Sequence, residues 1–342
     1  MKLSVFVFLT SLILPCTGFS AQLLNTEDIG KTENVVMTHE GRVFVASQRG
    51  VVEVIRTDFL NDGSQPGPLA NNCQYDSDRD FVICHLADSL LKNGPCLLTG
   101  LTTDGTYLYS ACTAIDTNDN LVEEQGAELF RILPGKNRGT VASVERHILE
   151  QPEWYNGMAV DDNGYLYLSA SRATYNEAAI VRAKLPAHDE YFYPQFTAWL
   201  KKSNETMPNG IQIDGSTLYY STGRKIEAIN INSSGSAGIA TTLYTAGYLS
   251  ILDDIAITPN HIAITEVDGY NLGHSENKIV LVEKEPSPAP QWCWFNCVTQ
   301  LTIPTGKVRA SSLVYDKRGL FYAPDTLIAT SFFEGGLYLH HY

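Results

Sequence analysis

A short phrase that recurs six times most constrains how this chain can fold. In each copy a polar residue precedes an alternating strand, a tight turn and a second strand rich in Tyr, Val and Ala. The copies begin at Glu33, Thr99, Asn156, Asn209, Asp253 and Ser311. Their spacing of about 45 to 65 residues is that of a four-stranded propeller blade. The sequence therefore predicts an all-β, six-bladed β-propeller with four-stranded blades around a central channel.

The bulk composition fits one large folded unit and limits its partners. Hydrophobic residues make up 44% of the 342 residues and charged residues 18%, which excludes a disordered chain. The formal net charge of -14 would repel nucleic-acid phosphates and anionic lipid surfaces. We therefore expect no nucleic-acid partner, and we expect a monomer that acts on a small-molecule substrate.

The N-terminus has the pattern of an export signal. Lys2 supplies a positive charge, an apolar stretch covers 5–14, and small residues suited to cleavage follow up to Ala21. We expect residues 1–21 to be a signal peptide and 22–342 a single propeller, secreted or periplasmic, with no later transmembrane segment. An uncleaved anchor and lipidation of Cys16 are the alternatives.

Six cysteines lie beyond the predicted signal, and an even number in an exported chain favours disulfides. Cys293 and Cys297 are expected to form a local bridge, because their spacing does not match a zinc knuckle and no histidine lies nearby. The other four are expected to pair among themselves, in an order that the sequence leaves open. They are Cys73, Cys84, Cys96 and Cys112.

The polar residue that opens each copy is the candidate functional position. The innermost strand of a propeller blade lines the channel, so these side chains would point into the funnel. Glu33, Asn156, Asn209 and Asp253 carry the oxygen ligands that a hard divalent cation prefers. We expect these four to bind Ca²⁺. The alternative is that the Asn-Gly and Asp-Asp pairs are ordinary turn residues.

The same motifs resemble a known superfamily. They are Glu33-Asn34, Tyr155-Asn156-Gly157, Pro208-Asn209-Gly210-Ile211 and Leu252-Asp253-Asp254-Ile255. This pattern resembles the six-bladed group that contains gluconolactonase, senescence marker protein, diisopropyl fluorophosphatase and the paraoxonases. The resemblance implies Ca²⁺ held by the four predicted ligands, with Asn34 and Asp254 beside it or at a deeper ion. It also implies that Asp253 is the base or nucleophile in hydrolysis of a lactone, ester or related substrate.

The sequence departs from this family at the second blade. Paraoxonases place a histidine there, whereas this chain has Thr99. None of the eight histidines lies at an aligned funnel position, although His274 could reach the opening from a loop. A non-enzymatic binding propeller with a structural calcium ion is therefore the alternative to a calcium-dependent lactonase, and a platform without metal is the third reading.

Overall fold

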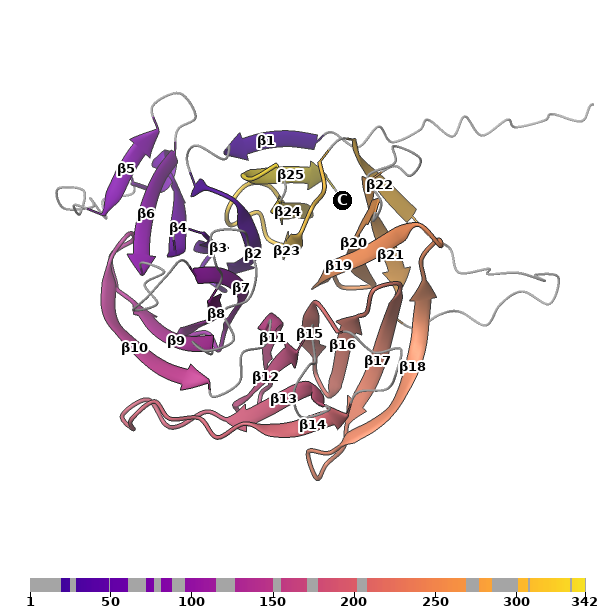
Figure 1. Cartoon of the computed structure of the whole chain (residues 1–342). Helices are drawn as coiled ribbons and strands as arrows, with labels where there is room; N and C mark the ends of the chain where they lie inside the picture. Colours follow the sequence, from indigo (N-terminus) through magenta and orange to yellow (C-terminus); the bar gives the residue numbers. More distant parts are fainter. Residues whose placement is uncertain are drawn as a thin grey trace, which may run out of the picture.

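The structure is a computed structural model in which six β-sheets surround a central axis (Figure 1). It describes residues 20–24, 29–48, 50–60, 72–76, 81–87, 96–114, 127–149, 155–170, 178–201, 208–268, 277–284, 301–306, 308–332 and 334–341. The innermost strands of neighbouring sheets contact one another around the full circle, so the sheets form one closed ring. The prediction of a six-bladed propeller is confirmed.

The first three blades contain the following strands, given from the channel outward. Blade 1 has β2 (Thr32–Met37), β3 (Val43–Ser47), β4 (Gly50–Arg56), β6 (Phe81–Ala87) and β5 (Cys73–Asp76), with the 3₁₀ turn η1 (Thr57–Leu60) after β4. Blade 2 has β7 (Cys96–Thr103), β8 (Leu108–Ala114), β9 (Ala127–Pro134) and β10 (Val141–Leu149). Blade 3 has β11 (Tyr155–Val160), β12 (Tyr165–Ala170), β13 (Ala178–Lys184) and β14 (Thr197–Lys201).

The remaining three blades each have four strands. Blade 4 has β15 (Ile211–Asp214), β16 (Thr217–Ser221), β17 (Lys225–Ile231) and β18 (Ala237–Thr245). Blade 5 has β19 (Ser250–Ile257), β20 (His261–Asp268), β21 (Asn277–Glu283) and β22 (Leu301–Gly306). Blade 6 has β23 (Ser312–Asp316), β24 (Thr326–Thr330), β25 (Leu337–His341) and β1 (Ser20–Leu24).

Blade 6 joins the two ends of the described chain. Its outermost strand β1 runs antiparallel to β25, with Ser20 opposite His340 and Ala21 opposite Leu339. This pairing connects the first described strand to the last blade and so helps to close the ring. The first two residues of β1 fall inside the predicted signal peptide, so cleavage after Ala21 would leave the remainder of the strand in place.

The core lies between the blades, and β3 shows why. All five residues of this second strand are buried, because one of its faces packs on each neighbouring blade. Val43 and Val45 join a cluster with Ile328 of blade 6. Phe44 faces the other way and joins a cluster with Leu108 of blade 2. Strict alternation along the strand therefore supplies two separate interfaces.

The described cysteines agree with the disulfide prediction in part. Cys73 and Cys84 lie opposite each other on β5 and β6 and form a disulfide, which fits the expected pairing within this group. Cys112 is also disulfide-bonded. The predicted Cys293–Cys297 bridge lies outside the described residues. In the part of the chain that the structure describes, no helix is long and apolar enough to span a bilayer.

Candidate metal centre

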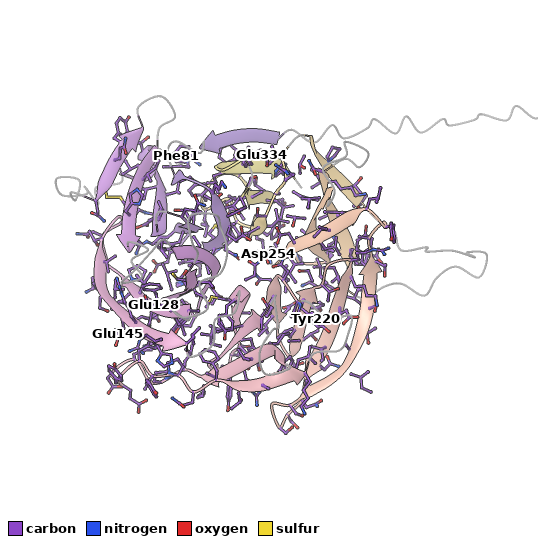
Figure 2. The ribbon with its side chains drawn as sticks, viewed as in Figure 1. Phe81, Glu128, Glu145, Tyr220, Asp254 and Glu334 are labelled. Atoms are coloured by element: carbon purple, nitrogen blue, oxygen red, sulfur yellow. A yellow bond between two sulfur atoms is a disulfide. The ribbon has the colours of Figure 1, made fainter. Side chains whose placement is uncertain are left out.

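The four predicted calcium ligands lie at the same end of the channel, where the inner strands begin. Glu33 is in β2, Asn156 in β11 and Asp253 in β19, while Asn209 stands two residues before β15. All four side chains are half-buried. Asp254, the neighbour of Asp253, lies near the centre of the ring (Figure 2). Because the four candidate ligands hold equivalent positions in their repeats, the propeller places them around one axis.

The four side chains contact one another in two pairs. Asn209 Nδ2 donates a hydrogen bond to Asp253 Oδ1 at 2.5 Å, which joins blade 4 to blade 5. The Glu33 carboxyl group forms a side-chain hydrogen bond with Asn156, which joins blade 1 to blade 3. Glu33 also lies within electrostatic range of Asp253. The predicted ligands therefore converge, although they are as far apart in sequence as 33 and 253.

One oxygen in this group has no partner. Asn209 Oδ1 is buried and accepts no hydrogen bond, while the amide nitrogen of the same side chain is bonded to Asp253. A buried acceptor without a partner costs about 1–3 kcal/mol. A carboxamide oxygen beside two carboxylates is a ligand that Ca²⁺ accepts. The residues present therefore fit a hard cation.

Burial raises the pKa of each carboxyl group in this cluster, and repulsion by a neighbouring carboxylate adds to the shift for Glu33 and Asp253. Burial, with the nearby charge of Asp253, raises the pKa of Glu33 well above its usual range, although the bond to Asn156 opposes the shift. Burial and then the charge of Asp254 raise the pKa of Asp253 to about 8. Burial also raises the pKa of Asp254 to about 6. Among the described residues none of the three carboxylates has an ion-pair partner, so a divalent cation would relieve this repulsion.

The candidate centre is rich in amides. No group of three or more His, Cys, Asp or Glu side chains with a metal-binding arrangement occurs in the described ranges. Half of the four candidate donors are instead carboxamides, which add oxygen atoms without adding charge. Such a donor set suits Ca²⁺ better than zinc, which takes nitrogen and sulfur ligands.

The residues that follow Glu33 and Asp253 form hydrogen bonds with other strands. Asn34 Nδ2 donates to the backbone oxygen of Asn156 at 3.4 Å. Asp254 accepts a hydrogen bond from Ser312, and its backbone nitrogen donates to Thr265 Oγ1 at 3.1 Å. The bonds of Asn34 to Asn156 and of Ser312 to Asp254 connect different blades, whereas the bond to Thr265 lies within blade 5. The implied role of Asn34 and Asp254 in a metal shell stays a prediction.

Glycine follows both candidate asparagines because the inner strands approach closely. A Cβ on Gly157 would lie 2.1 Å from the backbone oxygen of Asn209. A Cβ on Gly210 would lie 2.2 Å from Asp254 Oδ1 and 2.6 Å from its Cα. Such distances are far inside van der Waals contact, so only glycine fits. The Asn-Gly pairs are therefore close-packing positions at the channel rather than ordinary turns.

The sequence reasoning missed a set of hydroxyl groups on the second strands. Ser169 Oγ of blade 3 accepts from the backbone nitrogen of Gly157 at 2.6 Å and donates to the backbone oxygen of Asn209 at 2.6 Å. Ser221 of blade 4 repeats this, accepting from Gly210 and donating to Asp253. Each hydroxyl thus links its own inner strand to the candidate ligand of the next blade.

The third hydroxyl group of this set belongs to blade 6 and links it to blade 1. Thr330 Oγ1 donates to the backbone oxygen of Glu33 at 3.0 Å. Ser169, Ser221 and Thr330 are each fully buried, so these bonds are shielded from water. A Ser or Thr lies at or near the end of the second strand in the repeated phrase, and that recurrence was the available signal.

The second and sixth blades contribute differently. The side chain of Thr99 lies outside the described residues, as does His274. Ser311 is 2% exposed, and its Oγ accepts a hydrogen bond from the backbone nitrogen of Phe332 at 2.7 Å. Ser311 therefore holds the loop after β24 and does not point freely into the funnel.

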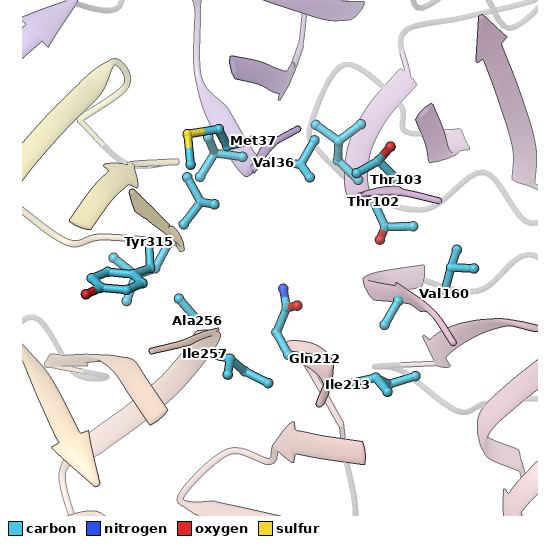
Figure 3. A pocket seen from close by; sticks show the side chains of 15 residues that line it. Val36, Met37, Thr102, Thr103, Val160, Gln212, Ile213, Ala256, Ile257 and Tyr315 are labelled. Carbon is cyan, nitrogen blue, oxygen red and sulfur yellow. The ribbon is translucent and has the colours of Figure 1, made fainter. Parts of the chain in front are cut away.

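The other end of the channel has the opposite character. A cavity of about 300 Å³ lies among the later residues of the six inner strands (Figure 3). Most of the residues that line it are apolar, with Val36, Val160 and Ile257 among them. The carboxamide of Gln212 projects toward the middle (Figure 3). Among the described residues, none of those that line this cavity is charged.

Comparisons with known proteins support the fold. No protein-family model matches the chain, and no curated protein sequence matches it. A solved luciferin-regenerating enzyme matches with a TM-score of 0.54 at 13% identity over 95% of each chain. The PQQ domain of pyranose dehydrogenase from Coprinopsis cinerea matches with a TM-score of 0.57 at 8% identity over 96% of each chain. A calcium structure of a Trichoderma reesei carbohydrate-active enzyme of family AA12 matches with a TM-score of 0.54 at 10% identity over 96% of each chain.

Identities this low show a shared propeller and nothing finer. A luciferin-regenerating enzyme and the PQQ domain of a dehydrogenase share this fold, so the fold does not choose among reactions. The gluconolactonase-like resemblance of the motifs remains a proposal. Function must therefore be argued from the residues at the charged end of the channel.

Proposed function

We propose that this protein is a calcium-dependent hydrolase that opens a lactone or cleaves a related ester at the charged end of its channel. The unpartnered Asn209 Oδ1, held beside Asp253 by the bond from Nδ2, carries this proposal. Glu33, Asn156, Asn209 and Asp253 would hold the ion. The gluconolactonase-like motifs support the same reading.

Bound Ca²⁺ would supply polarisation of the substrate carbonyl oxygen. The chain supplies the proton chemistry. Asp253 would take a proton from water as the water oxygen bonds to the carbonyl carbon, and would return it to the alkoxide when the ring C–O bond breaks. A hydroxy acid is the product, and all atoms balance. Direct attack by the Asp253 carboxylate, followed by hydrolysis of the acyl-enzyme, is the other route.

Two contacts suit Asp253 to this role. Asn209 Nδ2 fixes Oδ1, and Ser221 fixes the backbone carbonyl, so the carboxyl group is held in one orientation. A pKa raised to about 8 means that this carboxyl group binds a proton readily near neutral pH. Binding of a cation favours the ionised form and would bring the pKa down toward the range of a working base.

An exported location supports the proposal. A disulfide such as Cys73–Cys84 persists in oxidising surroundings, and calcium is abundant outside the cell. We propose that the protein is secreted or periplasmic, with residues 1–21 acting as its signal. A binding propeller with a structural calcium ion is the second candidate, because Ser311 serves the backbone and not the funnel.

The test is hydrolysis of a panel of lactones and aryl esters at millimolar Ca²⁺ and again with EDTA. We expect activity that EDTA removes and Ca²⁺ restores. Asp253→Asn should lower kcat by at least about a hundredfold, because the base is lost. Asp162→Asn, a change at an exposed carboxylate of the β11–β12 turn, is the matched control and should leave activity intact. An inert panel, with Ca²⁺ bound, would favour the binding propeller.

A further inference from the structure

The segment that leads into Asp253 presents a run of apolar side chains to solvent. Tyr248 is 78% exposed, Leu249 36% and Ile251 43%. Single exposed apolar residues are ordinary, but three within four positions form a patch. We call Tyr248, Leu249 and Ile251 the apolar rim. We propose that the substrate carries an aliphatic or aryl group that packs on this rim, an inference that rests on the proposed function.

The apolar rim lies at the charged end of the channel. The chain passes from β18, the outermost strand of blade 4, to β19, the innermost strand of blade 5, and the rim occupies this crossing. Along the start of β19, Ile251 is exposed, Leu252 is buried and Asp253 is half-buried. Ile251 and Asp253 therefore share one side of the strand. A substrate whose carbonyl group reaches Asp253 would extend over Ile251.

Hydrogen bonds fix the backbone of this crossing. Ala246 N donates to the backbone oxygen of Arg224 at 2.8 Å, and Leu252 N donates to that of Gly223 at 3.0 Å. The Arg224 guanidinium lies 5.2 Å from the centre of the Tyr248 ring and donates to the Ala246 oxygen at 3.2 Å. Tyr248 is thus held in place by a cation–π contact while its ring stays exposed. A surface fixed in this way binds a ligand with little ordering cost.

The neighbouring blade 6 also carries an aromatic ring at this end. Phe332 follows β24 in blade 6, and its backbone nitrogen is bonded to Ser311 at the sixth funnel position. The Lys31 ammonium lies 5.1 Å from the centre of its ring. The end of β24 lies beside the start of β23, so blades 5 and 6 both carry apolar residues at the end of the ring where the inner strands begin. A polyhydroxylated lactone would meet few hydrogen-bonding partners on Leu249 and Ile251, whereas an alkyl chain would lose water against them.

The first test is kinetic. The probes are γ-lactones with linear side chains of about one to eight carbons, compared with gluconolactone. For a partly open surface we expect kcat/KM to rise about twofold per methylene and to be lowest for gluconolactone. The triple variant Tyr248→Ser, Leu249→Ser and Ile251→Ser should flatten the series. Ile239→Ser is the control, because Ile239 is 91% exposed on β18 and away from the rim.

The second test measures binding without turnover. Calorimetric titration with γ-lactams of the same side chains should give affinities that rise with chain length for the wild type and for Ile239→Ser, and not for the triple variant. If lactam affinity rises with chain length in this way and no lactone is opened, the rim proposal is supported and the hydrolase proposal is refuted. If lactones are opened but neither series depends on chain length, or if gluconolactone is the better substrate, the rim proposal is overturned. Equal lactam affinities in the wild type and the triple variant overturn it as well.

Discussion

The hydroxyl group of Ser221 donates a hydrogen bond to the backbone oxygen of Asp253 in the next blade. The same Oγ accepts from the backbone nitrogen of Gly210 at 2.8 Å. One buried side chain thus sets the spacing between the inner strands that carry Asn209 and Asp253. The position of the proposed base is determined by a residue of another blade that touches neither ion nor substrate.

Ser221→Ala should weaken calcium binding. The substitution leaves the Gly210 N–H without its partner and releases the Asp253 carbonyl, so the two candidate ligands lose their fixed spacing. We expect a loss of about 1–3 kcal/mol in unfolding free energy and a fall of roughly tenfold in Ca²⁺ affinity. Chemical denaturation and calorimetric titration with Ca²⁺ measure the two effects.

Ser110→Ala is the matched control for that variant. Ser110 is fully buried on the second strand of blade 2, and its Oγ donates to the backbone oxygen of Gly100 at 2.9 Å. It contacts no candidate ligand through that bond. We expect a similar loss of stability with unchanged Ca²⁺ affinity. Equal losses of affinity in both variants would contradict a positioning role for Ser221.

Gly210→Ala should disrupt the junction of blades 4 and 5. The new Cβ would lie 2.6 Å from the Cα of Asp254, and backbone on neither side can yield cheaply. We expect the free energy of unfolding to fall by about 3 kcal/mol or more. Gly223→Ala is the control, because a Cβ there meets nothing within 4 Å and the backbone needs no positive φ. A thermal melt that shows equal stability for the two variants would refute the close-approach argument.

His340 should make stability depend on pH. It is fully buried in β25, neither ring nitrogen has a hydrogen-bond partner, and burial lowers its pKa to about 4. The unfolded chain therefore binds a proton near pH 6.5 while the folded chain stays neutral, so stability falls as the pH falls from about 7 to 4. His340→Leu should remove about 2–3 kcal/mol of that loss. Chemical denaturation at pH 7 and pH 4 measures this loss, with a substitution of the exposed His39, His39→Leu, as the control. If the unfolding free energy of His340→Leu depended on pH as strongly as that of the wild type, the prediction would be contradicted.

Local patterns predicted the fold because each blade repeats them. Glu33, Asn156, Asn209 and Asp253 hold the same position in their copies of the repeated phrase. That position lies near the start of an inner strand in each blade, which was enough to align the four residues. The channel then brings them together by symmetry. This is why residues far apart in sequence could be predicted as neighbours.

Other features depended on pairings that no local pattern specifies. The extra strand β5 in blade 1 and the closure of blade 6 by β1 are choices of strand partner over long separations. The Ser221 and Thr330 hydroxyls act on the next blade, so their role appears only when the blades are placed side by side. The Cys73–Cys84 pairing likewise needed the register of β5 against β6.

Calorimetric titration of the metal-free protein with Ca²⁺, run beside Asn209→Leu, tests the central claim most directly. The variant keeps the branched shape of the side chain and removes the unpartnered Oδ1, together with the Nδ2 bond to Asp253. We expect saturable binding by the wild type and a loss of at least about tenfold in affinity for Asn209→Leu. Wild-type protein that takes up no calcium, or a variant that binds it equally well, would contradict the account.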